Sequence, residues 1–180
     1  MEKKDLYKVA IVEPKFKREE IFNKITENYC SNMITKIGNP QLLLFNIYQK
    51  SKTKSITINK HEKIMTIFSN IARKSSIYIS PGVLIENIKG NVLPTAYLFN
   101  PEGELILKQR EIFTLSLEKN LSKEDKNNLN KKNIKLNVVD TELGKLGFII
   151  NNDCFYPEIA RFLSLKGVDI VLAVNNIIDD

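Results

Sequence analysis

The sequence predicts an α/β fold in which sheets and helices pack in layers. Its first half alternates short β-branched runs with amphipathic segments, a pattern typical of β-α-β-α units. The middle holds strand-like runs joined by hairpin turn residues, and the last third reads as strand, polar corner, helix and strand. With 180 residues, no internal repeat and no interdomain linker, we expect one domain over residues 1–180.

The first half of the chain is expected to form two strands and two helices. The apolar runs at 8–13 (KVAIVE) and 41–47 (QLLLFNI) are typical of buried strands. Between them, apolar residues recur every three or four positions over 17–36, which predicts one amphipathic helix. A second helix is expected over 60–74, with Asn59 as its N-cap.

Three strand-like runs follow, at 76–82, 92–100 and 104–113. The letters NPEG at 100–103 supply Asn, Pro and Gly in the order that favours a tight turn, so the last two runs should form a hairpin. The lysine-rich stretch at 119–133 is expected to be a solvated loop or a marginal helix.

The last third is expected to form a hairpin, a helix and a final strand. Residues 134–150 read as two strands joined at the letters DTELG, and 168–174 (VDIVLAV) reads as a buried strand. Between them a helix should begin near Pro157 and end at Gly167, which suit a first turn and a C-terminus. Its buried face is expected to hold Ile159, Phe162 and Leu163.

Composition excludes several classes of protein. The net charge of +6 comes from dispersed lysines interrupted by acidic residues, with no aromatic platform, so nucleic acid is not an expected partner. No apolar run is long enough for a membrane span and the N-terminus lacks signal-peptide features, so we expect a cytoplasmic protein without a membrane partner. Cys30, Cys154 and the single His61 have no metal-ligand spacing, so no metal or cofactor is expected, and His61 should be exposed near a helix start.

The corner IINNDCFYPE, at 149–158, is the segment in which reactive side chains are most expected. A tight strand-to-helix turn exposes one side chain beside the free N–H groups of the helix start. The candidates at this turn are Asn151, Asn152, Asp153 and Cys154. No Lys or His neighbours Cys154 in the sequence, so nothing there predicts an activated thiolate and a packing role is favoured.

The order of these segments resembles the carbon–nitrogen hydrolase, or nitrilase, superfamily over residues 8–176. The corner carries the most specific part of the resemblance, because the family typically reads G-x-x-I-C-x-D-x-x-x-P-E-x-x-R there. The matching residues are Gly147, Ile150, Asp153, Pro157, Glu158 and Arg161. The resemblance implies an αββα sandwich and a hydrolase acting on amides or nitriles.

The family's reaction uses a cysteine nucleophile, a glutamate general base and a lysine that stabilises the oxyanion. Its motifs place the cysteine on Asn151, the lysine on Glu111 and the glutamate on Ile47, and no glutamate lies between Gln41 and His61. The resemblance therefore implies that the whole Glu-Lys-Cys triad is replaced.

The residues that survive are those expected to build the elbow itself, namely Gly147, Asp153, Pro157, Glu158 and Arg161. Asp153 should accept hydrogen bonds from backbone N–H groups at the corner, and Glu158 should pair with Arg161 on one helix face. These expectations describe retained structure without retained chemistry.

Family members usually continue past the strand equivalent to 168–174, so the resemblance implies a truncated fold whose C-terminal part, and thus part of the second sheet, is missing. An exposed sheet edge of this kind is expected to be covered by a partner chain. Family members also tend to dimerise through helices near the corner, so a homodimer is the other expectation.

Three functions remain open from the sequence. The first is a catalytically inactive relative, acting as a partner subunit or persisting as a degenerate remnant. The second is a divergent but active amidase or nitrilase-type hydrolase. The third is a module that binds a small ligand in the old pocket, whose candidate residues are Glu111, Asn151, Asn152, Asp153 and Cys154.

Overall fold

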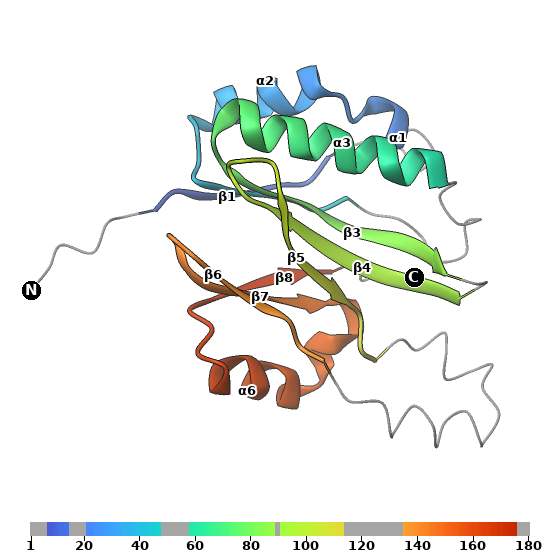
Figure 1. The fold of residues 1–180 in the computed structure, drawn as a ribbon, viewed down its shortest axis with the longest axis vertical. Helices are drawn as coiled ribbons and strands as arrows, with labels where there is room; N and C mark the ends of the chain where they lie inside the picture. Colours follow the sequence, from blue (N-terminus) through green and yellow to red (C-terminus); the bar gives the residue numbers. More distant parts are fainter. Residues whose placement is uncertain (1–6, 15–20, 48–57, 89–90, 114–134, 176–180) are drawn as a thin grey trace, which may run out of the picture.

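The computed structural model describes residues 7–14, 21–47, 58–88, 91–113 and 135–175. These residues form four layers, in the order helices, sheet, sheet, helix (Figure 1). The expected αββα sandwich is therefore confirmed. The predicted loop or helix at 119–133 lies outside the described residues.

Among the described residues, the first sheet has five strands in the order β1-β2-β3-β4-β5. They are β1 (Val9–Val12), β2 (Leu42–Phe45), β3 (Tyr78–Ile88), β4 (Asn91–Phe99) and β5 (Leu105–Arg110). The first three strands are parallel to one another and the last two are antiparallel to their neighbours. The predicted hairpin turn is confirmed by two backbone hydrogen bonds. The N–H of Gly103 donates to the carbonyl of Asn100, and the N–H of Asn100 donates to the carbonyl of Glu104.

Three helices cover one face of this sheet: α1 (Ile21–Lys24), α2 (Glu27–Ile37) and α3 (Ile58–Ser75). The single helix predicted over 17–36 is wrong. Thr26 adopts an extended conformation and its hydroxyl accepts the N–H of Tyr29, so it starts a new helix. Asn59 was also predicted wrongly as an N-cap, because α3 begins at Ile58 and includes it.

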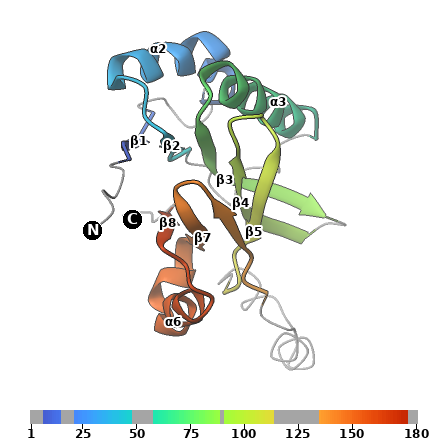
Figure 2. The ribbon, with the colours of Figure 1, turned by 60° about the vertical axis from the view of Figure 1, so that its left-hand side comes forward.

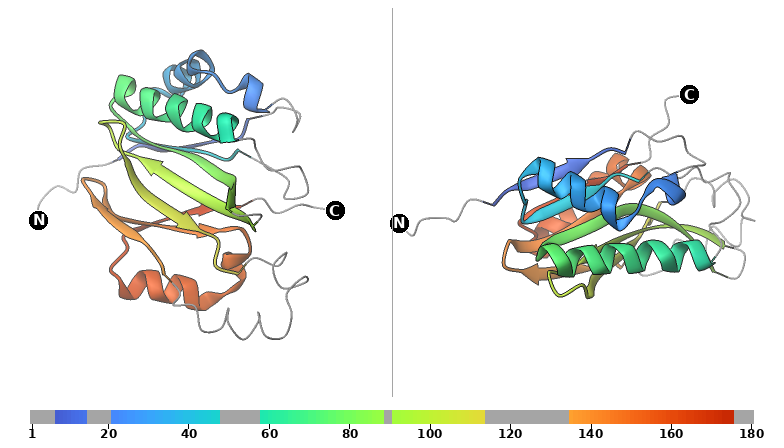
Figure 3. Two further views of the ribbon diagram at one scale, coloured as in Figure 1. Left: turned by 45° about the vertical axis from the view of Figure 1, so that its right-hand side comes forward. Right: turned by 90° about the horizontal axis from the view of Figure 1, so that it is seen from above.

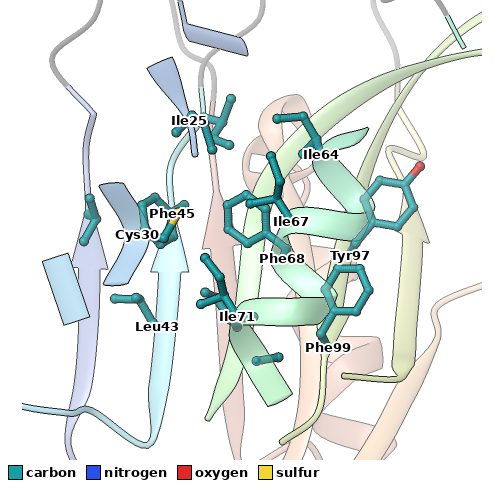
Figure 4. Close-up of a cluster of buried hydrophobic side chains, with 14 of the residues drawn as sticks. Ile25, Cys30, Leu43, Phe45, Ile64, Ile67, Phe68, Ile71, Tyr97 and Phe99 are labelled. Carbon is teal, nitrogen blue, oxygen red and sulfur yellow. The ribbon is translucent and has the colours of Figure 1, made fainter. Parts of the chain in front are cut away.

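The core beneath these helices is apolar and closely packed (Figure 4). Phe45 of β2 meets Phe68 of α3 edge to face, with ring centroids 5.2 Å apart. Cys30 of α2 is fully buried in the same core, where it packs as an apolar side chain. The apolar faces of the amphipathic helices thus cover one face of the first sheet.

The second sheet, in the part of the chain that the structure describes, has three strands in the order β6-β7-β8. They are β6 (Val138–Thr141), β7 (Gly144–Ile150) and β8 (Ile170–Val174). β6 and β7 form the predicted antiparallel hairpin, while β7 reaches the parallel β8 through a 3₁₀ turn, η1 (Asn151–Phe155), and helix α6 (Pro157–Leu165). α6 lies on the outer side of this sheet (Figure 3).

Helix α6 starts at Pro157 as predicted, and Ile159 and Leu163 are buried under it. Phe162 was predicted to be buried with them, but its side chain is 47% exposed. The apolar stripe of α6 is therefore wider than the surface of β6 and β7 that it covers.

The space between the sheets holds a second apolar core, built from both inner faces. Leu42 and Leu44 of β2 contribute to it from the first sheet, and Phe148 and Leu172 from the second. The prediction that the first strand is buried is wrong for one of its faces, because Ile11 is 66% exposed. Among the helices of the described ranges, none combines the length and apolarity needed to cross a bilayer.

Gly82 allows the backbones of β2 and β3 to come close together. Its φ is +85°, and a Cβ there would lie 2.3 Å from the carbonyl oxygen of Phe45. The pairing of β3 with β4 shifts register between Ile79 and Gly82, so the strand is irregular at this point. Only glycine fits both the left-handed conformation and the contact.

We therefore expect Gly82→Ala to lower the free energy of unfolding by about 2–4 kcal/mol, through backbone strain and a clash with Phe45. Gly167→Ala is the matched control, because Gly167 has φ +75° but open space around a Cβ. It should cost only about 1 kcal/mol. Urea unfolding of both variants measures the difference, and equal losses would contradict the role of the contact.

Candidate functional site

The candidate site lies where strand ends from the two sheets meet. Glu111 directly follows β5 in the first sheet, and Asn151 directly follows β7 in the second. The N–H of Glu111 still donates to the carbonyl of Pro94, at 2.9 Å, so β4 holds this residue in place beyond the end of its strand. The two positions come together although they are forty residues apart in the sequence.

The carboxylate of Glu111 is buried against the corner, with the residue only 7% exposed. Its Oε1 accepts the backbone N–H of Asn152 at 3.2 Å and the side-chain Nδ2 of Asn152 at 2.8 Å. The side chain of Asn151 also hydrogen-bonds to it. Two neighbouring amides thus surround one buried carboxylate.

Asp153 makes a second link between the same two segments. Its carboxylate accepts the backbone N–H groups of Ile112, at 3.1 Å, and Phe113, at 2.9 Å, and it is also hydrogen-bonded by the N–H of Ile150. The residue is 1% exposed. It holds the chain after β5 against the chain after β7, which is a structural task.

Burial sets the acid–base character of both carboxyl groups. It raises the pKa of Glu111, and the negative charge of Asp153 adds to this rise, while the hydrogen bonds from Asn152 and Asn151 oppose it. Burial also raises the pKa of Asp153 against its backbone hydrogen bonds. The ionised form of a carboxyl group is therefore disfavoured in this site.

Asn151 begins η1 with φ +45°, in the left-handed region. Asparagine tolerates this conformation better than most residues that carry a Cβ. The backbone at the corner is thus turned sharply, which directs the amide side chains of Asn151 and Asn152 to Glu111.

The remaining candidate positions lie apart from this cluster. Ile47 is fully buried in the core beneath the helices. Cys154 is exposed on η1, so the structure groups Glu111, Asn151, Asn152 and Asp153 without a thiol among them. Position 47 thus contributes apolar packing. The packing role predicted for Cys154 is wrong, because its side chain faces solvent on η1.

The elbow residues shape the turn into α6. Gly147 leaves room for Leu163, whose Cδ2 would lie 2.9 Å from a Cβ at that position. Pro157 occupies the first turn of α6 with Glu158, where an acidic side chain suits the helix dipole. The predicted pair of Glu158 with Arg161 does not form in the described structure, where both side chains are exposed.

Sequence reasoning missed a second polar cluster, on the helix side of the first sheet. His61 was predicted to be exposed, but it is half-buried, and its Nε2 lies 3.1 Å from the hydroxyl of Tyr97. Tyr97 hydrogen-bonds to Glu86, which forms ion pairs with Lys108 and Arg110. Only the register of β3, β4 and β5 brings these residues together, so the sequence carries no local signal for them.

The charges in this cluster have the opposite effect to those at the corner. Burial alone would raise the pKa of Glu86, but hydrogen bonds from Lys108, Tyr97 and Arg110 outweigh it and lower the pKa to about 2. The cluster therefore stabilises an ionised carboxylate and is a satisfied ion-pair network.

Comparison with known proteins gives one family. The family model described as carbon-nitrogen hydrolase matches residues 44–179. A hydrolase of Schizosaccharomyces pombe is 29% identical over 106 residues, which are 58% of this chain and 33% of that protein. Omega-amidase NIT2 of Mus musculus is 26% identical over 106 residues, 58% of this chain and 38% of its own. The matches span only 33% and 38% of the length of these relatives.

Solved structures share the fold. A carbon–nitrogen hydrolase from Helicobacter pylori G27 superposes with a TM-score of 0.69 at 19% identity, covering 94% of this chain and 59% of its own. A variant of the amidase from Nesterenkonia sp. AN1, with the acetamide moiety of fluoroacetamide on its active-site cysteine, has a TM-score of 0.70 at 15% identity. It covers 94% of this chain and 64% of its own.

The raised pKa of Glu111 predicts a pH-dependent stability. Because folding raises this pKa above its ordinary value of 4.5, ionising Glu111 costs stability as pH rises through the folded-state pKa. Glu111→Gln keeps an acceptor for Asn152 but does not ionise. We expect its stability relative to the parent protein to increase from about pH 4.5 upwards.

Glu86→Gln is the matched control with the opposite sign. The lowered pKa of Glu86 stabilises the parent protein above pH 4.5, and this benefit is lost as pH falls towards 2. Urea unfolding of both variants across pH measures the two effects. A stability difference for Glu111→Gln that does not change with pH would contradict the burial of its charge.

Proposed function

The chain belongs to the carbon–nitrogen hydrolase family, and we propose that it is a member without the hydrolytic activity of that family. We propose that it acts through association with other chains. The loss of hydrolytic activity is supported by the residues at the corner, where the buried carboxylate of Glu111 is surrounded by the amides of Asn151 and Asn152.

The family's reaction requires groups that these positions do not supply. In this proposal Asn151 stands where the nucleophile belongs, and an amide side chain cannot form a covalent acyl intermediate. Glu111 stands where a lysine would stabilise the oxyanion, so a carboxylate replaces a cation there. Losing a single oxyanion donor costs about 10²–10³ in rate, and a like charge at that place opposes the transition state further.

The general base is also absent in this proposal, because position 47 holds a fully buried isoleucine. Cys154 does not replace the missing nucleophile, since its exposed side chain lies outside the cluster around Glu111. A divergent active hydrolase would have to route its chemistry through this thiol. A module that binds a small ligand would have to displace the amides that already occupy Glu111.

The homodimer in this proposal forms through the surface beside the corner. Three large apolar side chains are exposed on η1 and α6, namely Phe155 at 68%, Phe162 at 47% and Leu165 at 73%. Phe162 and Leu165 are three residues apart on α6 and therefore share one helix face. An exposed apolar patch of this kind marks an association surface. The free thiols of Cys30 and Cys154 suit the reducing cytoplasm, where we place the protein.

We expect the purified protein to show no turnover of butyramide or of a simple nitrile. Fluoroacetamide, which leaves an acetamide moiety on the active-site cysteine of the Nesterenkonia amidase, should modify neither cysteine here. Iodoacetamide is the control reagent and should label exposed Cys154 but not Cys30, because burial raises the pKa of Cys30 to about 12. Mass spectrometry of intact protein reads both results. Turnover that Cys154→Ala abolishes would overturn the proposal.

The homodimer has its own test in Leu165→Lys. A charge placed in the proposed interface should weaken dimerisation at least about tenfold in sedimentation velocity. Leu105→Lys is the control, because Leu105 is 44% exposed on β5, away from α6. A parent protein that sediments as a monomer at all concentrations, or equal effects of both variants, would contradict this interface.

A further inference from the structure

Helix α3 is held on the first sheet by different chemistry at its two ends. In its C-terminal half, Ser69 Oγ donates to the carbonyl of Gly103 at 2.6 Å, and Arg73 Nε donates to the carbonyl of Glu102 at 3.0 Å. Both carbonyls belong to the turn between β4 and β5. A hydroxyl and a guanidinium keep their charge across the pH range in which proteins work, so these two contacts do not respond to mild acid.

The N-terminal end of α3 has one such contact among its described side chains, which are those of residues 61–75. His61 Nε2 lies 3.1 Å from the hydroxyl of Tyr97, and the two ring centroids are 5.4 Å apart. Glu62 and Lys63 are exposed, and the first buried apolar side chain in this range is Ile64. His61 therefore holds the first turn of the helix on the sheet.

The network beneath His61 determines which of its nitrogens carries the proton. The pKa of Glu86 is about 2, so this residue is an ionised carboxylate and can only accept hydrogen bonds. The hydroxyl of Tyr97 therefore donates its one proton to Glu86, and its oxygen accepts the N–H of His61 Nε2. The neutral imidazole then has its lone pair on Nδ1, where a second proton would bind.

His61 faces charged groups on the sheet and on its own helix. Glu86 of β3 lies behind Tyr97 and is paired with Arg110 of β5. Lys108 of β5 reaches over the same tyrosine, with its Nζ 5.5 Å from the centre of the ring. On α3 itself, the neighbouring Glu62 acts on the imidazole. The acid that α2 presents to α3, Glu27, contacts Asn70 at the other end of the helix.

These surroundings disfavour the charged imidazolium. Burial is the largest influence and lowers the pKa of His61 below its ordinary value of 6.5. Lys108 lowers it further, whereas the carboxylates of Glu86 and Glu62 oppose the shift without cancelling it. A proton on Nδ1 therefore creates a half-buried cation beside an existing one.

We propose that His61 is a proton-operated latch, which holds the first turn of α3 against Tyr97 when neutral and releases it into water when protonated. Release hydrates the imidazolium, which the half-buried position disfavours. Because folding lowers the pKa of His61, its stabilising contribution is complete above pH 6.5 and is lost as the pH falls from 6.5 through the folded-state pKa. The C-terminal half of α3 stays in place, since Ser69 and Arg73 keep their contacts.

Opening the latch uncovers a buried aromatic ring. Tyr97 is only 1% exposed, and its hydroxyl points away from the apolar side chains of the core (Figure 4). The latch is separate from the loss of catalysis and from the homodimer, because α3 and α6 lie on opposite outer faces of the sandwich (Figure 2). Mild acid thus changes the helix-covered face of the first sheet and leaves the corner unchanged.

Hydrogen exchange of the full 180-residue chain at pH 7.5 and 5.5 tests the latch, after correction for the intrinsic effect of pH on exchange. The amides of residues 62–65 donate to the carbonyls of the first turn. At pH 5.5 they should lose protection at least about threefold, while the amides of residues 69–74 change less than about 1.5-fold. His61→Gln keeps a donor for Tyr97 but does not titrate, so residues 62–65 should keep their protection in this variant.

Ser69→Ala is the matched control, because it removes a contact that does not titrate. It should speed exchange of residues 69–74 equally at both pH values and leave the pH response of residues 62–65 as in the parent protein. Thermal unfolding at pH 7.5 verifies that both variants fold.

The imidazole provides a second measurement, which needs no variant. His61 is the only histidine of the chain, so its NMR signal is unambiguous, and we expect it to titrate with a midpoint below 6.5. A midpoint at or above 6.5 would overturn the latch. So would unchanged protection of residues 62–65 in the parent protein at pH 5.5, or a loss of protection that His61→Gln shares.

Discussion

The arrangement depends on one strand, β2, whose four residues are buried on both faces. Leu43 and Phe45 pack under the helices, and Leu42 and Leu44 pack under the second sheet. A strand that is apolar on every side needs a layer above and a layer below, and parallel neighbours that cross over through helices. The four-layer sandwich satisfies these needs, and Gly82 allows β3 to approach the end of β2 closely.

The two polar clusters show how surroundings decide what a buried carboxyl group can do. Glu86 is held by two cations and a tyrosine, so its charge is stabilised. Glu111 is buried and lies near Asp153, so its charge is disfavoured, although the amides of Asn152 and Asn151 donate hydrogen bonds to it. Amides satisfy the hydrogen-bonding capacity of a carboxylate without neutralising it. The corner is therefore locally complete as a hydrogen-bonded structure around Glu111 and Asp153, and the thiol of Cys154 is exposed to solvent.

Much of the fold follows from the sequence, because strands, hairpins and the corner have local signals. Pro157 and the letters NPEG fix turns through their own backbone chemistry, and the structure has both turns where they were expected. The break at Thr26 was missed because the apolar period continues across it. The exposure of Ile11 and the contact of His61 with Tyr97 depend on which distant segments lie opposite. The same holds for Glu111. Its amide partners lie forty residues away in the sequence, and only the tertiary structure brings them into contact with it.

The double burial of β2 also bears on the order in which the chain is made. A ribosome releases residues 42–45 well before residues 138–174, which form the whole second sheet and its helix. Helices α1 and α2 precede β2 in the chain and α3 follows it, so the cover of Leu43 and Phe45 is synthesised early. Leu42 and Leu44, by contrast, face water until the last third emerges. The nascent chain thus carries an apolar strand surface through most of translation, and such surfaces engage chaperones or aggregate. Closing the sandwich, through Asp153 and the corner, ends this exposure.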